Sequence, residues 1–565
     1  MNKRKSTFHA ETSVWNFLMI GIIVFVFCAC KSKNEPIVQQ DVLDKPKIVN
    51  IVNFIRLLEP RDPNITEEVL YQTVVEQIKL LKKYHLKATF LLQYDALLDA
   101  RYQKLLKELS KEDFEIGAWW EIPQPLVENA GMQWRGRYPW DWHADIGFST
   151  GYTPEEREKL ADVYMRDFKN IFGYYPKSVA SWFVDAHTLN YLYEKYDIVA
   201  SANCKDQFGT DGYTLWGGYW NQAYYPSKIN SYMPAQNEKN QIPVPIFRML
   251  GSDPIRQYDT GLDSDRQGVE SLEPVYPNSG GNKEWVKWYL NEFVHGEAME
   301  FGYTQAGQEN SFTWNGMKTG LEMQFPLIDS LRNENKVKVE TLEESGRWFK
   351  KHYKVTPATS VTINNDLKGS NKKTVWFNSR FYRANLLWEN GTLRFRDIHV
   401  FDESLQSPYL DRKVESNQAL FFTLPIVDGY LWSSSEKLAG LRFYRLKGNE
   451  KIDLIGGDPS VTNPTKGKLH ISWPIKDTKA FLVMDIEEKK IRIKMEGETS
   501  IAWFLDLDTV ATNELPFVTI DPHKITAEFE NKAYALKAIK GNFSVPSEAV
   551  VFRITPEEQR IELEF

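Results

Sequence analysis

Residues 177–187 read Lys177-Ser-Val-Ala-Ser-Trp-Phe-Val-Asp185-Ala-His187, and this stretch decides the fold that we expect. The run from Val179 to Val184 predicts a short buried strand that ends on a carboxylate, and a helix is predicted from about Thr188. In a β/α barrel, a charged residue at the carboxyl end of a strand lies at the rim where substrate binds. Asp185 is therefore the first catalytic candidate, although Asp at this position equally suits the N-cap of the helix.

The same alternation of strand and helix signals runs through residues 48–352. Predicted strands cover 48–55, 87–93, 114–120, 179–184, 197–202, 243–250, 298–304 and 336–341, and the main predicted helices cover 66–84, 97–109, 283–295, 316–331 and 343–352. Seven or eight such units favour a β/α barrel, and a doubly wound open sheet is the alternative. The barrel is preferred because carboxylates recur at so many strand ends.

The pattern changes after residue 373. Residues 353–373 are rich in turn formers and predict a linker, and residues 374–565 contain short alternating runs such as Thr374-Val-Trp-Phe-Asn and Ile491-Arg-Ile-Lys-Met. Alternation of period two between turn residues is typical of an all-β sandwich. We therefore expect a barrel domain over 48–352 followed by a β-sandwich domain over 374–565.

The N-terminus has the features of a bacterial lipoprotein signal. A basic start is followed by an apolar run over 17–27, which is too short for a comfortable transmembrane span. The small residue Ala29 stands directly before Cys30, as in a lipobox. We expect residues 1–29 to be a signal peptide, Cys30 to be lipidated, and 30–47 to form a tether to a membrane of the bacterial cell envelope.

Composition narrows the class of partner. The chain has 565 residues, a formal net charge of −7 and 14% aromatic residues, including 18 Trp and 27 Tyr. A mildly acidic balance without basic clusters argues against nucleic acid, and many aromatic rings suit a protein that stacks on sugars. With Cys30 lipidated, Cys204 is the only other cysteine of the expected mature chain, so an intramolecular disulfide between side chains is excluded.

Four segments in order carry a resemblance to a known superfamily. They are Lys82-Lys-Tyr-His-Leu-Lys-Ala-Thr-Phe-Leu91, Phe114-Glu-Ile-Gly117, Trp182-Phe-Val-Asp-Ala-His187 and Val337-Lys-Val-Glu-Thr-Leu342. Together they resemble the glycoside hydrolase/deacetylase barrels, which include NodB-like polysaccharide deacetylases and the family 38 and 57 glycosidases, and a Bacteroidota lipoprotein family within that superfamily. The resemblance covers residues 48–352. It implies a hydrolase acting on glycans, and it maps the nucleophilic Asp of the family 38 enzymes onto Asp185.

The departures from this pattern concern the metal. The deacetylases carry an Asp-Asp pair on the first strand and two histidines after the third, whereas this chain has Asn53-Phe-Ile-Arg56 and Ala118-Trp-Trp-Glu-Ile-Pro-Gln-Pro125. The His-x-Asp of the family 38 zinc site is absent from the first strand as well. We therefore expect no catalytic metal and no cofactor, although His143 with Asp145 and Asp185 with His187 are pairs of ligand type.

Metal-independent glycoside hydrolysis needs two carboxyl groups across the scissile bond. We expect Asp185 to be the nucleophile and Asp253 or Glu121 to be the acid/base, with Glu309 as a further rim carboxylate. Two tryptophans precede Glu121 and could raise its pKa by desolvation. The alternatives are a salt bridge between Glu121 and Arg56, and an Asp-Pro turn at Asp253.

Substrate binding is assigned to residues at strand ends and on long loops. Arg56 could hold an anionic sugar, or it could form a structural ion pair. The remaining expected sugar contacts are Trp119, Trp120, Trp140, Trp142, His143, His187, Trp216 and Trp220. The sequence thus favours a lipid-anchored glycoside hydrolase that acts on an oligo- or polysaccharide. A diverged polysaccharide deacetylase and a non-catalytic glycan-binding lipoprotein are the alternatives.

Overall fold

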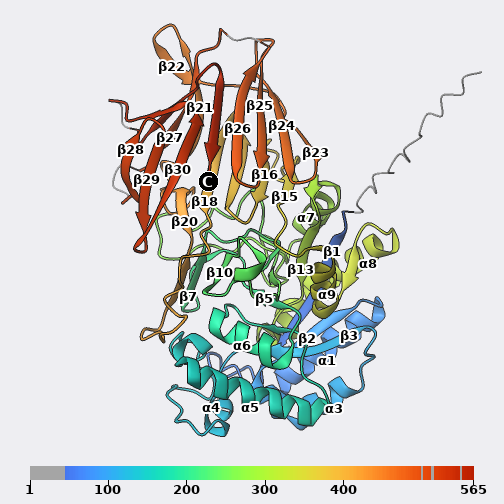
Figure 1. Cartoon of the computed structure of the whole chain (residues 1–565). Coiled ribbons are helices and arrows are strands. Elements are labelled where there is room, and N and C mark those ends of the chain that lie inside the picture. Colours follow the sequence, from blue (N-terminus) through green and yellow to red (C-terminus); the bar gives the residue numbers. More distant parts are fainter. Residues whose placement is uncertain (1–44, 498–499, 511–513, 548–549) are drawn as a thin grey trace, which may run out of the picture. The chain divides into compact units, whose positions relative to one another are not determined.

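The computed structural model describes residues 45–497, 500–510, 514–547 and 550–565, and residues Lys45–Phe565 form one compact unit (Figure 1). The predicted signal peptide, Cys30 and most of the predicted tether lie outside the described residues. Among the residues described, no helix is both long enough and apolar enough to cross a membrane. Residues 45–352 are called the α/β region below, and residues 353–565 the β region.

A parallel sheet organises the α/β region. Its strand order is β13-β1-β2-β3-β4, with β14 pairing the amino-terminal half of β1. The strands are β1 Lys47–Ile55, β2 Ala88–Leu92, β3 Phe114–Trp119, β4 Val179–Ala180, β13 Gly302–Ala306 and β14 Lys338–Glu340. β1 is almost continuously apolar and buried because both of its faces are covered.

A small sheet continues the curve. β5 Ser201–Asn203 pairs in parallel with β11 Ile246–Arg248, and β8 Ala223–Tyr224 pairs antiparallel with β11. The amide of Val179 donates to the carbonyl of Ala200 at 3.2 Å, which joins β4 to the β5 segment. The α/β region is therefore a parallel half-barrel sheet extended by a second sheet. On the open side, Phe247 of β11 contacts Tyr303 of β13 through their rings, with centroids 4.9 Å apart.

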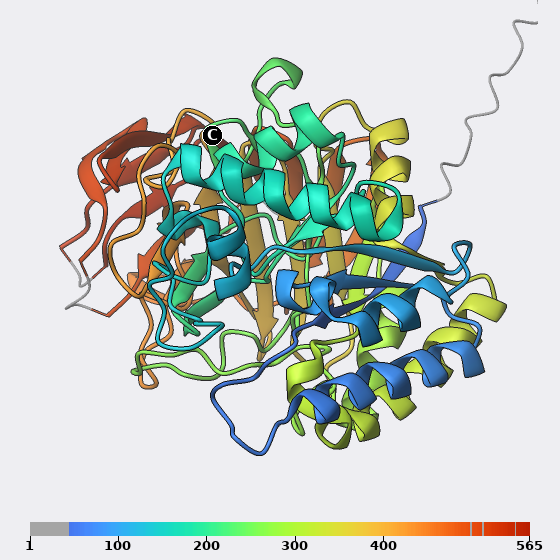
Figure 2. The same cartoon turned by 90° about the horizontal axis from the view of Figure 1, so that it is seen from below.

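Helices cover the outside of this sheet (Figure 2). They are α1 Glu67–Lys83, α2 Tyr94–Leu98, α3 Ala100–Lys107, α4 Gln124–Asn129, α5 Pro154–Phe172, α6 Ala186–Tyr196, α7 Lys283–His295, α8 Thr313–Asn333 and α9 Leu342–His352, with short 3-10 turns at Ser149–Gly151, Glu238–Asn240 and Asn310–Phe312. Their caps follow from the sequence. Thr66 accepts from the Val69 amide to start α1, and Thr153 with Glu156 forms a capping box before α5.

Side chains of β1 alternate between two cores. Ile48, Val52 and Phe54 pack inside the half-barrel with residues such as Trp119, whereas the intervening apolar side chains pack under the helices. This alternation is the period of two expected of a strand. It sends Arg56, two residues beyond Phe54, toward the inside at the carboxyl end of the sheet.

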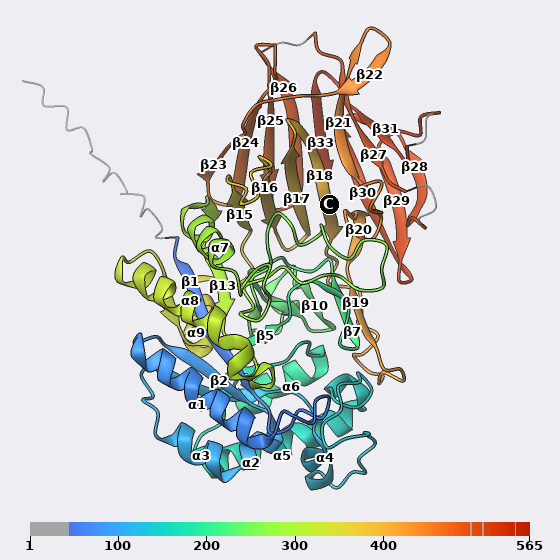
Figure 3. The same cartoon turned by 180° about the vertical axis from the view of Figure 1, so that it is seen from behind.

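Two large antiparallel sheets make up most of the β region (Figures 1 and 3). The first contains β12 Ala298–Met299, β15 Thr359–Ile363, β16 Lys373–Asn378, β17 Tyr382–Glu389, β18 Thr392–Val400, β20 Leu424–Val427, β21 Gly440–Lys447, β22 Glu450–Asp453, β27 Trp503–Asp508, β31 Asn542–Ser544 and β32 Arg553–Thr555. The second contains β23 Ser460–Thr465, β24 Lys468–Pro474, β25 Phe481–Glu487, β26 Lys490–Glu496, β28 Phe517–Asp521, β29 Lys524–Phe529, β30 Lys532–Lys540 and β33 Arg560–Glu564.

Three predicted elements differ from the structure. The strand predicted over 298–304 is split, because Glu300 has a φ of +58° that breaks the extended chain: β12 joins the large sheet of the β region and β13 joins β1. The strand predicted over 179–184 ends at Ala180. The stretch expected to be a linker, 353–373, contains β15, which pairs with β16.

Buried charges connect the two regions. Arg248 Nη2, at the end of β11, lies 2.8 Å from Asp206 Oδ1, and Arg383 of β17 pairs with both Asp206 and Asp397. These four side chains are at most 1% exposed, so each charge depends on its partner for stabilisation. The α/β region and the β region are therefore coupled electrostatically as well as by apolar packing.

His399 of β18 belongs to the same network. Its Nε2 lies 2.9 Å from Asp397 Oδ1 and 3.4 Å from Asp428 Oδ2, and its Nδ1 lies 2.9 Å from Thr423 Oγ1. The Thr423 hydroxyl donates its only hydrogen to the Gly217 carbonyl at 2.7 Å. Thr423 must therefore accept a hydrogen from Nδ1, and the two carboxylates near Nε2 favour the protonated ring.

Candidate active site

Three charged side chains meet at the carboxyl ends of β1, β3 and β13. Arg56 binds Glu121 through two parallel bonds, Nε to Oε2 at 2.8 Å and Nη2 to Oε1 at 2.6 Å. Its Nη1 lies 2.7 Å from Glu309 Oε2. All three side chains are at most 5% exposed. The sequence predicted each of them as a rim residue, and the fold brings all three together.

The ion-pair alternative for Arg56 and Glu121 is confirmed. The Nε and Nη2 groups of Arg56 are paired with Glu121 and its Nη1 group with Glu309, so no pair of N–H groups is free for an anionic sugar. The expectation that Arg56 holds an anionic sugar is therefore corrected. Burial lowers the pKa of Arg56, but Glu121 and Glu309 raise it above its usual value. The guanidinium also lies 4.1 Å from the ring of Trp140. Arg56 is therefore a fixed cation between two carboxyl groups.

Each carboxyl group has a further donor. Gln93, directly after β2, donates from Nε2 to Glu121 Oε2 at 2.7 Å, and Ser311 donates to Glu309 Oε1 at 2.6 Å. Burial raises the pKa of Glu309, and Arg56 opposes that rise. Glu121 is fully enclosed, whereas Glu309 keeps a small exposed fraction of about 5%.

A further buried carboxyl group, Glu273, which the sequence did not single out, is linked through the Gln308 side chain to the backbone of Glu309. Gln308 donates from Nε2 to Glu273 Oε2 at 3.2 Å, and its Oε1 accepts from the Glu309 amide at 2.9 Å. Lys205 Nζ lies 3.7 Å from Glu273 Oε1. Burial raises the pKa of Glu273 and Lys205 only opposes it. Lys205 stands two residues after β5, a strand-end signal, but nothing marks Glu273 within its long loop.

Two other groups belong to this neighbourhood. The pKa of Tyr276 is raised by Glu273 first, then by burial, Asp211 and Glu309, which places its phenol among those carboxylates. Burial raises the pKa of Asp95, which follows β2, to about 7. The carboxyl end of the sheet therefore holds several acids that ionise near or above their ordinary range, a feature of catalytic sites.

Asp185 lies elsewhere and has a structural set of partners. It accepts from the Thr188 amide at 2.8 Å as the N-cap of α6, from Ser149 Oγ at 2.6 Å, and pairs with Arg157 Nη1 at 3.0 Å. Each of these side chains is buried. The capping alternative is confirmed, and a nucleophilic role for Asp185 stays a prediction that this geometry does not favour.

Asp253 and His187 are also outside the Arg56 cluster. Asp253 accepts from the amides of Ile255 and Arg256, both at 2.8 Å, and from Trp285 Nε1 at 2.9 Å. This is the Asp-Pro turn that was the alternative for Asp253. His187 lies on α6 with Nε2 3.1 Å from Glu158 Oε1 of α5.

Five of the six expected sugar-stacking tryptophans are in the core, each at most 2% exposed. Trp119 stacks on Phe54 inside the half-barrel, whereas Trp120, its neighbour in sequence, points to the opposite face under the helices. Trp216 and Trp220 belong to a cluster with Trp376, and Trp140 covers Arg56. The expectation of exposed rings is wrong for these five, because long-range packing covers loops that look external in the sequence.

Trp142 and His143 are partly exposed, and both line a surface pocket of about 200 Å³. The pocket also contains Asp211 and Arg266. Arg61 connects this edge to the buried cluster, since its guanidinium is 5.3 Å from the Trp140 ring and its Nη1 is 3.8 Å from Asp211 Oδ1.

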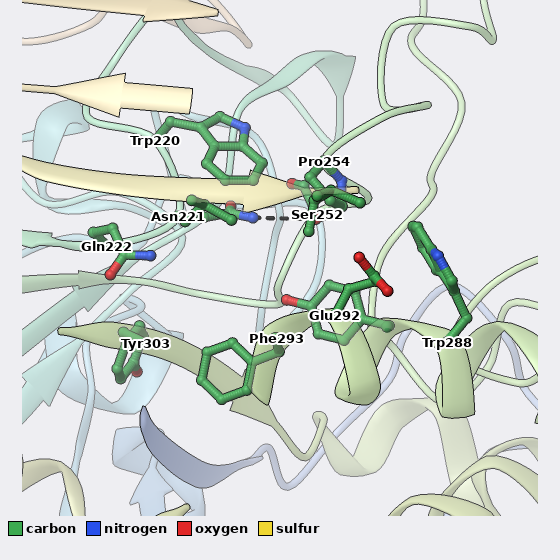
Figure 4. Close-up of a pocket in the computed structure, with 12 residues that line it drawn as sticks. Trp220, Asn221, Gln222, Ser252, Pro254, Trp288, Glu292, Phe293 and Tyr303 are labelled. Atoms are coloured by element: carbon green, nitrogen blue, oxygen red, sulfur yellow. Dashed lines mark hydrogen bonds between the residues drawn. The ribbon is translucent and has the colours of Figure 1, made fainter. Parts of the chain in front are cut away.

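A second cavity lies between α7 and β15 (Figure 4). Trp220, Trp288, Phe293 and Tyr303 form part of its wall, and its volume of about 20 Å³ is enough for about one water molecule. This cavity is too small for a sugar, and none of the residues that line it belongs to the Arg56 cluster.

Among the residues that the structure describes, no group of three or more His, Cys, Asp or Glu side chains has the arrangement of a metal site. The pairs His143/Asp145 and Asp185/His187 are thus not part of larger ligand sets within the described ranges.

Comparison with known proteins finds one family model, which matches part of the chain. The family DUF3863, a domain of unknown function with a solved structure, matches residues 142–380. No curated protein matches the chain.

Solved structures that resemble the chain do so at low identity. A candidate glycoside hydrolase/deacetylase from Parabacteroides distasonis has 15% identity and a TM-score of 0.48, covering 71% of this chain and 90% of its own. A candidate polysaccharide deacetylase from Mycobacterium smegmatis has 11% identity and a TM-score of 0.34, covering 54% and 91%. The 4-alpha-glucanotransferase of Thermococcus litoralis has 10% identity and a TM-score of 0.32, covering 92% and 98%.

Proposed function

We propose that the chain is a glycoside hydrolase whose two working carboxyl groups are Glu309 and Glu273. The observation that carries the proposal is the unequal pairing of these two buried groups, which the Gln308 side chain connects at the carboxyl end of the half-barrel sheet. Glu309 has a guanidinium at 2.7 Å, whereas the nearest cation to Glu273 is an ammonium at 3.7 Å. Hydrolysis of a glycosidic bond needs such a pair, one group ionised and the other protonated.

The roles follow from the partners. Arg56 and the Ser311 hydroxyl stabilise the charged form of Glu309, which suits it to attack the anomeric carbon or to take a proton from water. Glu273 is held by neutral donors and a more distant Lys205, so burial keeps its proton available for the leaving oxygen. The carbon–oxygen bond breaks and the leaving oxygen gains the Glu273 proton. Water supplies the new hydroxyl on the anomeric carbon, and its other proton passes to Glu309 if water attacks directly, or to Glu273 if Glu309 has first formed a glycosyl ester; exchange with solvent then restores the starting protonation of both carboxyl groups.

Arg56 and Glu121 position Glu309, one member of this pair. The doubly bonded Glu121 fixes the guanidinium, and the guanidinium fixes Glu309. Glycan as the substrate class rests on the sequence resemblance to glycoside hydrolase/deacetylase barrels. The proposed mechanism uses side chains of the protein alone.

The test is mass spectrometry of a panel of oligosaccharides incubated with the purified protein, with and without EDTA. We expect fragments that have gained water in both conditions. Glu309→Gln and Glu273→Gln should each lower the rate by about 10²–10⁴-fold, whereas Asp185→Asn should keep the chemistry. Loss of acetyl groups, inhibited by EDTA, would instead identify a deacetylase. Binding of glycan without any product would identify a non-catalytic lipoprotein.

We also propose that the protein is attached to a membrane of the bacterial cell envelope through lipidated Cys30. The support is the sequence alone, with Ala29 directly before the cysteine at the end of an apolar run. The test is incorporation of labelled palmitate in a bacterial host. Cys30→Ser should abolish labelling, and the matched variant Cys28→Ser should leave it intact. Equal labelling of both variants would contradict the proposal.

A further inference from the structure

A segment of the β region returns to the α/β region at the surface pocket. β19 Ala419–Phe422 pairs in parallel with β7 Tyr213–Trp216, which also pairs with β6 Gln207–Thr210, and Figure 3 shows β19 beside β7. The Ala419 amide donates to the Gly212 carbonyl at 2.9 Å, and the Ala144 amide donates to the Asn417 carbonyl at 3.3 Å. Asn417 is therefore held by its own backbone against the loop that carries Trp142 and His143.

The facing side of the pocket is a tight hairpin. Asp211 and Gly212 connect β6 to β7 with φ values of +48° and +77°, the left-handed geometry of a two-residue turn. A Cβ on Gly212 would lie 2.8 Å from the Asn417 carbonyl oxygen. The glycine is therefore required for the close approach of the two segments, and this approach sets where Asp211 stands relative to Asn417.

The chemistry of the pocket suits hydroxyl groups. Its wall combines one indole, one imidazole, one carboxylate, one guanidinium and two primary amides, from Trp142, His143, Asp211, Arg266, Asn417 and Gln418. Donors and acceptors of this mixture can pair with adjacent hydroxyls, and the indole can cover C–H groups. The pocket volume of about 200 Å³ equals the volume that about six or seven water molecules occupy in the liquid. A single sugar ring has a volume of this order.

Aromatic and cationic side chains connect the pocket to Arg56, which is paired with Glu309. The rings of Trp140 and Trp142 are 6.2 Å apart, Arg56 lies against the first, and Arg61 lies 5.6 Å from the second. A glycan chain bound in the pocket would thus extend toward the buried acids past Arg61, whose side chain is 33% exposed.

We propose that this pocket is a distal sugar subsite for an uncharged oligosaccharide, with Asn417 and Gln418 as specificity residues contributed by the β region; the assignment rests on the proposed glycoside hydrolase function. A neutral ligand is favoured because Asp211 and Arg266 balance in formal charge, and because Arg56 is occupied by two carboxylates. Recognition at a distance from the reacting bond makes the enzyme prefer chains to disaccharides.

The experiment measures binding and hydrolysis of four neutral hexasaccharides, namely cellohexaose, maltohexaose, xylohexaose and N-acetylchitohexaose, with hexagalacturonate as the anionic comparison. We expect at least one neutral probe to bind. Asn417→Ala and Gln418→Ala should each raise its Kd and KM by about 10-fold, which corresponds to about 1.4 kcal/mol, with kcat unchanged. The disaccharide of the same sugar should show no such difference. The exposed neighbour Glu415, which does not line the pocket, provides the control Glu415→Ala.

The outcomes separate the two proposals. Binding that depends on Asn417 without hydrolysis would support the subsite and remove the proposed function. Hydrolysis with KM unchanged in both amide variants would keep the function and overturn the subsite. Binding of hexagalacturonate alone, or of no probe, would also overturn it.

Discussion

Replacing Arg56 with methionine removes the cation that two buried carboxyl groups share. Methionine keeps most of the unbranched side chain under Trp140, so the change is chiefly electrostatic. Glu121 and Glu309 are at most 5% exposed and would be left without their counter-ion. Breaking a buried ion pair by removal of one partner costs about 3–5 kcal/mol. We expect a loss of this size in the free energy of unfolding at neutral pH.

The sign of the pH dependence follows from linkage. Without Arg56, the burial that raises the pKa of Glu309 is no longer opposed by that cation, so the folded-state pKa lies further above the unfolded value of about 4.3. The folded variant then binds more protons than the unfolded chain, so its stability falls as pH rises between those two values. The slope reaches about 1.4 kcal/mol per pH unit for each such carboxyl. The destabilisation should therefore be small near pH 4 and largest above pH 7.

The assay is urea unfolding followed by tryptophan fluorescence at several pH values between 4 and 8. The matched control is Arg101→Met, because Arg101 pairs with several carboxylates, Asp99 at 2.8 Å, Glu67 at 3.0 Å and Glu68 at 3.7 Å, but is 36% exposed. That control should lose about 1 kcal/mol or less. A loss below 1 kcal/mol in Arg56→Met, or an equal loss at pH 4 and pH 8, would refute the reasoning.

Two further predictions concern groups outside the Arg56 cluster. Burial lowers the pKa of His399, but Asp397 and then Asp428 raise it above its ordinary value of 6.5. The protonated His399 therefore stabilises the folded protein fully below about pH 6.5. This contribution is lost as pH rises through the pKa of His399 in the folded state. His399→Gln should therefore flatten the fall in stability on the alkaline side in urea titrations, and an unchanged profile would contradict the imidazolium assignment. Asp185→Asn should cost about 3–5 kcal/mol, because it leaves the buried Arg157 without its counter-ion and weakens the cap at Thr188. Hydrolysis at saturating substrate should keep its rate in the folded variant, and complete loss of activity there would restore Asp185 as the nucleophile.

Local signals in the sequence determined most of the elements of the α/β region. The predicted helix 283–295 has the same bounds in the structure, because Asn282 caps it and its apolar residues recur at helical spacing. Thr66 marked the start of the predicted helix 66–84 for the same local reason, because its side chain caps α1. The strand-end rule found Arg56, Glu121 and Glu309, since parallel strands bring their carboxyl ends to one edge whatever the distance along the chain.

Only the tertiary structure decided what these residues contact. The same rule also selected Asp185, whose carboxylate caps a helix and pairs with Arg157. A strand-end position in the sequence does not distinguish a carboxylate of the Arg56 cluster from one that caps a helix. Glu273 comes from a long loop without a periodic signal, and the Gln308 side chain that joins it to Glu309 depends on packing between distant segments. Burial of the loop tryptophans has the same origin. Short-range order follows from the local sequence, whereas the partners of a buried charge or ring are set by contacts between residues far apart in the chain.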